Sequence, residues 1–128
     1  MTIEKYLPTG NEIVSLPLID ENTAHIWSMN FLHMGYRGLV ELNGCENPLL
    51  PFLQPYLLVH EKEIVLSPEN LKFQRFNYWI PQFIAESEGV QVTGTYLTPV
   101  LERGFAIHLS AKNVGNDKKE IFLGLRGS

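Results

Sequence analysis

The sequence is poor in the residues that support redox, metal and nucleic-acid chemistry. Cys45 is the single cysteine among 128 residues, so an intramolecular disulfide is impossible and a zinc site built on thiolates lacks ligands. Lysine and arginine number 10, and Lys118-Lys119 is their one adjacent pair, while the formal net charge is −4. Nucleic-acid binding needs a basic stripe that neutralises phosphates, and an acidic surface is repelled by anionic lipid. We therefore expect no nucleic-acid partner and no membrane partner.

Long apolar runs are also missing. No stretch approaches the roughly 18 apolar residues of a membrane-spanning helix, and the opening residues, MTIEKYLPTG, contain no apolar core of a secretory signal. Cytoplasmic residence is therefore expected. Charged residues make up 19% of the chain and hydrophobic residues 45%. This low charge content favours a protein that covers part of its surface with a partner or another domain.

Helical periodicity is a third absence. The chain instead repeats short β-rich runs, and its 8 prolines and 10 glycines mark the breaks between them together with Asn and Asp. This pattern predicts an all-β fold, a mostly antiparallel β-sandwich of about eight or nine strands. We find no boundary inside the chain, so residues 1–128 are expected to form a single domain. The expected strands are 12–19, 25–32, 38–42, 56–60, 63–66, 71–88, 90–96, 105–111 and 121–125.

Two parts of this pattern carry specific predictions. Residues 71–88 change their apolar face between Phe73 and Phe76, which predicts one long strand with a bulge or bend. Residues 103–128 alternate apolar and polar side chains on both sides of a turn at 113–117, which predicts a terminal β-hairpin. The sequence stops soon after its last apolar strand position, and we therefore expect a fragment or the N-terminal module of a larger protein.

No catalytic constellation stands out. His60 is followed four residues later by Ile64, so the pair of histidines on a zinc-binding helix is missing. No Gly-x-Ser-x-Gly turn presents a nucleophile. The carboxylate pairs Glu61/Glu63 and Glu86/Glu88 could act as acid and base on a glycosidic bond, but acidic residues beside turns usually serve solubility. We expect no catalytic residue, no metal site and no cofactor.

The aromatic side chains give the strongest binding signal. Phe76, Tyr78 and Trp79 lie close together in the chain, and Trp27 belongs to an earlier strand. Exposed aromatic faces on a flat sheet can stack against sugar rings, whereas the same side chains inside a sandwich form its core. Both interpretations stay open, with the core favoured for the group. Alternation places Trp79 opposite Phe76 and Tyr78, so Trp79 leads the candidate substrate-binding residues, with Tyr78 and Trp27 beside it.

Several phrases of the chain are shared with a known family. They are YRGLVELNG (36–44), LLPFLQPYLLVHEKEIVL (49–66), YWIPQF (78–83), VTGTYLTP (92–99) and GFAIHLSAKNVGNDKKEIFLGLRGS (104–128). Together they resemble the N-terminal β-sandwich, or super-sandwich, domain of bacterial glycoside hydrolases and phosphorylases with an (α/α)6-barrel catalytic domain. The outline of the last strands of such domains is matched by Asn113, Gly115, Gly124 and Gly127. The resemblance implies catalytic carboxylates on the helical barrel and none on this chain.

Three functions follow from these observations. The first is a non-catalytic β-sandwich module of a carbohydrate-active enzyme, whose partner is the helical catalytic domain and which shapes the rim of its active site. The alternative is a free-standing carbohydrate-binding module that holds an oligosaccharide on exposed aromatics. The third is a small all-β lyase or isomerase that uses Glu86, Glu88 or histidines, and it has the weakest support because no constellation rises above background.

Overall fold

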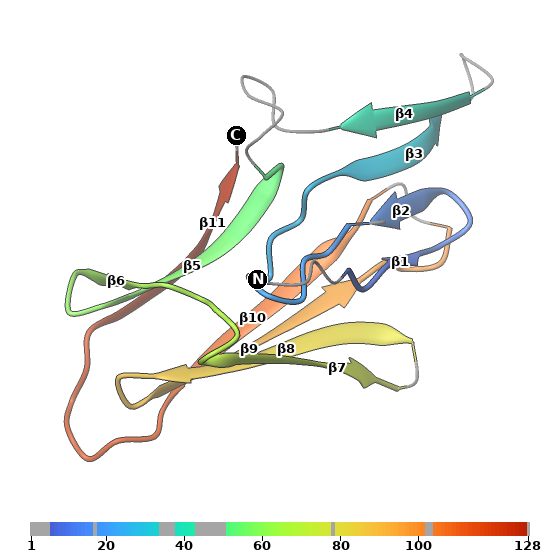
Figure 1. Cartoon of the computed structure of the whole chain (residues 1–128). Coiled ribbons are helices and arrows are strands. Elements are labelled where there is room, and N and C mark those ends of the chain that lie inside the picture. Colours follow the sequence, from blue (N-terminus) through green and yellow to red (C-terminus); the bar gives the residue numbers. More distant parts are fainter. Residues whose placement is uncertain are drawn as a thin grey trace.

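The computed structural model describes residues 6–16, 18–33, 38–42, 51–77, 79–101 and 104–127, with the backbone alone described for 31–33 and 38–42. These residues form strands and turns and contain no helix, so the expected all-β fold class is confirmed. They hold 11 strands, more than the number expected, because the 71–88 run divides into two strands and a short strand precedes residue 12. The strands form three antiparallel sheets in a β-sandwich-like arrangement (Figure 1).

The three sheets are named here by their position in the fold. The main sheet, in the order β10-β9-β8-β7, contains β7 (Leu71–Phe76), β8 (Ile80–Ser87), β9 (Val90–Leu97) and β10 (Ala106–Asn113). The small sheet, in the order β11-β5-β6, contains β5 (Leu53–Val59), β6 (Lys62–Ile64) and β11 (Ile121–Gly127). The N-terminal sheet contains β1 (Thr9–Gly10), β2 (Val14–Leu16), β3 (Met29–His33) and β4 (Gly38–Leu42), in chain order.

The hydrophobic core lies between the main sheet and the small sheet. Successive side chains of a strand point to opposite faces, and β8 and β9 follow this alternation closely. Buried inner positions of the main sheet are Leu71, Phe83, Ala85, Val90, Val92 and Tyr96. Those of the small sheet are Leu57, Val59 and Ile64. In the expected strand 90–96, the alternating positions Val90, Val92, Gly94 and Tyr96 thus form the buried face.

An N-terminal segment, residues 14–26, joins the two sheets into one core. Its fully buried apolar side chains include Leu16, Ile19, Ala24 and Ile26. Ile26 and Leu53 of β5 exchange two backbone hydrogen bonds, with N···O distances of 2.8 and 3.0 Å. The Tyr96 hydroxyl of β9 donates a hydrogen bond of 2.6 Å to the Ala24 carbonyl. In Figure 1, β5 and β11 rise away from the main sheet, and the blue N-terminal segment lies between this pair of strands and the main sheet.

The expectation of one long strand over 71–88 is wrong. β7 and β8 are the arms of a hairpin in which Leu71 pairs with Ala85 and Phe76 pairs with Ile80. The turn begins at Asn77, whose φ of 49° lies in the left-handed region that asparagine tolerates. Phe73 and Phe76 lie on opposite faces of β7 because they are an odd number of residues apart. Ordinary alternation therefore explains the change of face that the sequence analysis attributed to a bulge.

The expected terminal hairpin is also wrong. β10 pairs with β9 and β11 pairs with β5, so the connection at 114–120 carries the chain from the main sheet to the small sheet. Two backbone hydrogen bonds of 2.9 Å hold this connection, from the Val114 N–H to the Gly89 carbonyl and from the His60 N–H to the Glu120 carbonyl. Both strands face the same core, and this shared core produces the alternation that resembled a hairpin.

Candidate functional surfaces

Trp79 lies in the turn between β7 and β8, where its side chain is 77% exposed. The Trp79 carbonyl accepts a hydrogen bond of 3.1 Å from Arg75 Nη1, which ties the turn backbone to β7. Together with Ile80, Leu97 and Val100, Trp79 lines a depression of about 370 Å³ at one end of the main sheet. The residue thus lies outside the core, although in a turn and not on a strand face. Its role in binding stays a prediction.

Trp27 and Tyr78 differ from Trp79. Tyr78 lies outside the described residues. Trp27 is half-buried, and its Nε1 donates a hydrogen bond of 3.4 Å to Asp20 Oδ2. The ring of His25 meets the Trp27 ring edge-on, with centroids 6.2 Å apart. These contacts fix the Trp27 indole within the N-terminal segment, far from Trp79 in the chain, and no described contact brings the two tryptophans together.

The outer face of the main sheet carries polar side chains in cross-strand register. Gln74 of β7 pairs with Gln82 of β8, Gln82 pairs with Thr95 of β9, and Thr95 pairs with His108 of β10. These residues alternate with the core-facing positions of their strands, so they lie on the face opposite the core, where Thr95 is covered by its neighbours to 8% exposure. We call this set the polar row. It crosses all four strands of the main sheet.

Hydrogen bonds connect three members of the polar row. Gln74 Nε2 donates to Gln82 Oε1 at 2.7 Å, and Gln82 Nε2 donates to Thr95 Oγ1 at 3.0 Å. Each amide carries two N–H donors and a carbonyl oxygen, and the threonine hydroxyl can still donate. The donors and acceptors available to a ligand belong chiefly to Gln74, Gln82 and His108, because Thr95 is only 8% exposed. The contacts among Gln74, Gln82 and Thr95 restrict their rotamers.

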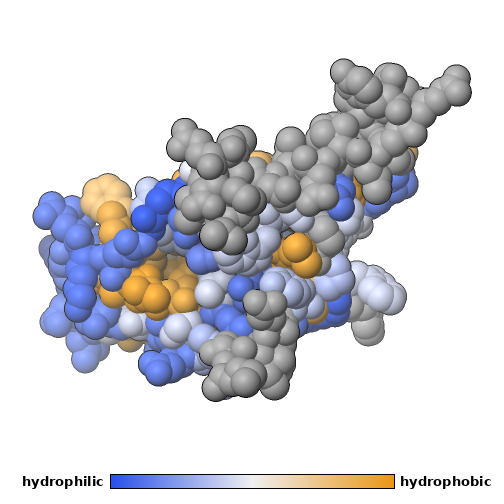
Figure 2. Space-filling model, turned by 45° about the horizontal axis from the view of Figure 1, so that its top comes forward, coloured by the Kyte–Doolittle hydropathy of each residue, from blue (hydrophilic) through white to orange (hydrophobic). Residues whose placement is uncertain are grey.

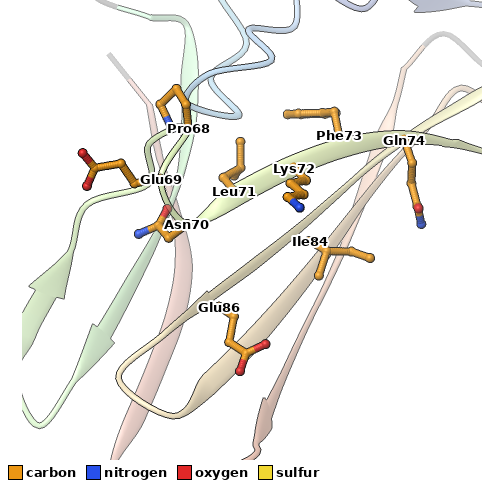
Figure 3. A pocket seen from close by; sticks show the side chains of 9 residues that line it. All are labelled: Pro68, Glu69, Asn70, Leu71, Lys72, Phe73, Gln74, Ile84 and Glu86. Carbon is orange, nitrogen blue, oxygen red and sulfur yellow. The ribbon is translucent and has the colours of Figure 1, made fainter.

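Depressions flank the polar row on both sides of β8. The one at the β7 side has a volume of about 370 Å³ and is shown in Figure 3. In this view Leu71 and Phe73 point to one side of the sheet, and Lys72, Gln74, Ile84 and Glu86 point to the other. A charged lysine and a carboxylate therefore lie at the β7 end of the outer face, next to the apolar Ile84 side chain.

The second depression lies over β8, β9 and β10 and has a volume of about 380 Å³. Its lining combines the polar row with neighbours on the same face: Phe76, Gln82, Thr93, Thr95, Leu97, His108 and Ser110. Phe76 is 46% exposed and supplies the aromatic surface of this site. We call the polar row, this second depression and the outer-face lining of the first one (Lys72, Gln74, Ile84 and Glu86) together the outer-face trough. The sequence alone could not reveal it, because the row forms only once the strand pairing is known.

The outer face of the small sheet carries an ion pair. Arg126 of β11 pairs with Glu63 of β6, and its guanidinium lies over the Tyr56 ring of β5 at 4.5 Å from the ring centroid. His25 lines the same shallow pocket of about 230 Å³. Burial lowers the pKa of His25, Asp20 opposes that shift, and Arg126 adds to it. The pair is half-exposed, so its contribution to stability is small.

One side of the sandwich leaves inner-face side chains uncovered. β10 and β11 end the orders of their sheets, and among the described residues no strand pairs with their outer edges. The inner positions Ile107, Leu109, Ile121 and Leu123 pack on the core but are only partly buried. Farther along the same faces, Ala111 is exposed and Leu125 is 43% exposed. We call these six residues the open side.

Exposed hydrophobic surface is also visible on a space-filling view. Figure 2 shows an orange, hollowed area toward the left-hand end of the molecule, the end at which β5 turns into β6 in Figure 1. Large exposed side chains of the small sheet and its flanks include Val65 at 75% and Phe122 at 53%. Single exposed apolar side chains are common on protein surfaces, so Val65 and Phe122 by themselves mark no contact site.

In the described ranges, no three His, Cys, Asp or Glu side chains come together in a group that could hold a metal ion. No helix that is long and apolar enough to cross a membrane occurs in these same ranges. The carboxylate pairs Glu61/Glu63 and Glu86/Glu88 lie at exposed positions near turns. Among the described residues, the one ion pair that these four carboxylates make joins Glu63 to Arg126.

Comparisons with known proteins leave the chain without a family. No protein-family model, no curated protein and no solved structure matches it. The fold and surfaces define the class of protein: an all-β, β-sandwich-like chain with a polar trough on the main sheet and an uncovered apolar side between β10 and β11. Its function has to be argued from these surfaces.

Proposed function

We propose that this chain is a non-catalytic β-sandwich module of a carbohydrate-active enzyme. In this proposal it packs against a helical catalytic domain and shapes the rim of that domain's active site. The open side is the observation that carries the packing role. The resemblance of residues 36–128 to the N-terminal domains of (α/α)6-barrel enzymes supplies the class of partner. Cytoplasmic residence stays a prediction from the opening residues.

The physical case rests on inner-face positions that lack cover. Alternation directs Leu109 and Leu125 toward the core, yet neither is fully buried. Fully burying an exposed leucine stabilises a protein by about 1.5–3 kcal/mol. The open-side residues are already partly buried, so a partner surface would add a fraction of this amount at each of several positions. Long edge strands also attract additional strands or covering elements, because their outer N–H and C=O groups are unpaired.

The gene around the coding segment gives the first test. A helical-barrel domain in the same or an adjoining reading frame supports the proposal, and a gene that encodes this chain with neither overturns it. The second test measures binding of the purified chain to that helical domain. Leu125→Lys should weaken the complex, whereas Val65→Lys, which changes an exposed valine beyond β6, should leave it intact. Equal affinities for the two variants would remove the open side from the proposal.

A free-standing carbohydrate-binding module is the second candidate, favoured by the 77% exposure of Trp79. An exposed indole provides a large rigid face on which a sugar ring can stack. Titration with a glycan panel tests this role, and Trp79→Ala should abolish binding without loss of fold. Phe122→Ala is the matched control, because Phe122 is an exposed aromatic on the small sheet. Absence of binding to every glycan would count against this candidate.

A further inference from the structure

We propose that the outer-face trough binds an internal segment of a neutral, linear oligosaccharide across the four strands of the main sheet. The inference rests on the proposal that this protein serves carbohydrate chemistry, but it assigns the ligand to a surface that does not depend on Trp79. The polar row, Gln74, Gln82, Thr95 and His108, supplies the hydrogen bonds of this site. Phe76 supplies its aromatic contact.

The hydrogen-bonding capacity of the row fits hydroxyl groups. A sugar hydroxyl donates one hydrogen bond and accepts others, so it suits a surface that offers donors and acceptors side by side. The amides of Gln74 and Gln82 each keep an N–H that is not used in the chain of bonds to Thr95. Because these bonds already hold the side chains in place, less conformational entropy is lost when a ligand binds.

The aromatic contact fits the opposite surface of a sugar ring. Phe76 is 46% exposed and lines the same depression as Gln82 and Thr95. Pyranose rings present C–H groups on their faces and hydroxyls at their edges. A ligand lying in the trough can therefore cover the Phe76 ring with an apolar face while its hydroxyls reach the polar row. This division of apolar and polar contacts is typical of small-molecule sites.

The length of the trough indicates an oligosaccharide. The polar row spans β7 to β10, and adjacent strands lie about 4.8 Å apart, so its ends are separated by roughly 14 Å, the length of about three pyranose residues. β7 and β10 are the two edges of the main sheet in the described structure. A chain can therefore continue past both ends of the row, which favours an internal segment over a chain terminus.

The charge distribution indicates a neutral ligand. The polar row contains amides, a hydroxyl and an imidazole, and it contains no carboxylate, ammonium or guanidinium group. Lys72 lines the depression at the β7 side together with two carboxylates, Glu69 and Glu86. An acidic sugar would therefore meet more negative than positive charge at this end of the trough.

The test is a titration of the intact chain, followed by calorimetry, with cello-, xylo-, manno- and maltooligosaccharides from disaccharide to hexasaccharide. One series should bind, with affinity that rises to about the trisaccharide or tetrasaccharide and then levels off. Gln82→Ala and Phe76→Ala should each weaken binding about tenfold or more. Gln91→Ala is the matched control, since Gln91 is on the same face of β9 but lines neither depression, and it should bind normally.

The outcomes separate the inference from the proposals on which it rests. Binding that is lost in Trp79→Ala but unchanged in Gln82→Ala and Phe76→Ala would overturn the trough and leave the carbohydrate-binding module standing. Affinity that does not depend on chain length would overturn the internal-segment assignment. If no series binds, both the trough and the free-standing binding module fail, whereas the packing role of the open side is unaffected. Circular dichroism of each variant confirms that the fold is retained.

Discussion

At the scale of single residues, two glycines leave the space in which an aromatic ring of the neighbouring strand packs. A Cβ atom at Gly94 of β9 would lie 2.1 to 2.8 Å from three ring atoms of Phe83. The Phe83 ring in turn lies within 6.1 Å of Tyr96, centroid to centroid. On the small sheet, a Cβ at Gly124 would lie 2.8 to 2.9 Å from the Tyr56 ring. Alternation along the sequence puts Gly94 on the same face as Val92 and Tyr96. It does not indicate that the Phe83 ring of the neighbouring strand packs over this glycine.

Gly94→Ala should therefore destabilise the protein strongly. The added methyl group requires the buried Phe83 ring to move, and overpacking of this kind typically costs about 1–3 kcal/mol. The midpoint of urea unfolding should fall accordingly. Gly104→Ala is the matched control, because a Cβ at Gly104 meets no atom within 4 Å. Equal midpoints for the two variants would contradict the packing of Phe83 on Gly94.

His25 should make stability depend on pH. Burial lowers the pKa of His25 below its ordinary value, with Asp20 opposing and Arg126 reinforcing the shift. The unfolded chain then binds a proton more readily than the folded chain. The His25 contribution is fully present above about pH 6.5 and is lost as the pH falls from there through the lowered pKa. His25→Gln should flatten the fall in unfolding free energy between about pH 7 and pH 5. An unchanged slope would refute this prediction.

At the scale of elements, local patterns predicted the strands better than their partners. The expected strands 56–60 and 63–66 correspond to β5 and β6, which pair as a hairpin with its turn at His60 and Glu61, whose φ angles are 50° and 65°. The strand at Gly38–Leu42 has the bounds that the sequence predicted. The predicted pairing of β10 with β11 was wrong. An alternation of period two indicates which face of a strand is buried, but it does not indicate which neighbouring strand supplies the hydrogen bonds. The polar row was unpredictable for the same reason.

The side chain of Asn113 adds three hydrogen bonds to the two backbone hydrogen bonds that hold the crossing from β10 to β11. Asn113 Nδ2 donates to the Asp117 carbonyl at 2.6 Å, and Asn113 Oδ1 accepts from the Gly115 N–H at 3.0 Å and from Lys119 Nζ at 3.3 Å. Asn113→Ala should lower the free energy of unfolding by about 1 kcal/mol. Amide hydrogen exchange should speed up first at Gly115.

A neighbouring asparagine provides the control for that crossing. Asn116→Ala changes an exposed side chain of the same loop, so it should leave stability within about 0.5 kcal/mol of the parent protein. If both variants unfold at the same denaturant concentration, Asn113 does not organise the crossing. The loop would then be fixed by its two backbone hydrogen bonds to Gly89 and His60.

At the scale of the whole molecule, the core is complete on one side and uncovered on the other. The N-terminal segment covers the space between the sheets through its contacts with Leu53 and Tyr96. On the opposite side, β10 and β11 present half-buried inner side chains, and within the described residues no strand pairs with their outer edges. The low charge content of the chain is consistent with a surface that is partly covered in use.

The open side should make copies of the isolated chain associate with one another. The open side combines apolar inner-face side chains with two strands whose outer edges are unpaired in the described structure. Both features favour association between copies of the chain, and this association increases with protein concentration. Sedimentation velocity should show a shift to larger species as the concentration rises. Leu125→Lys should reduce this shift, because it puts a charge on the open side at a residue that is already 43% exposed. Val65→Lys adds the same charge elsewhere, and a similar reduction by both variants would mean that net charge, and not the open side, governs association.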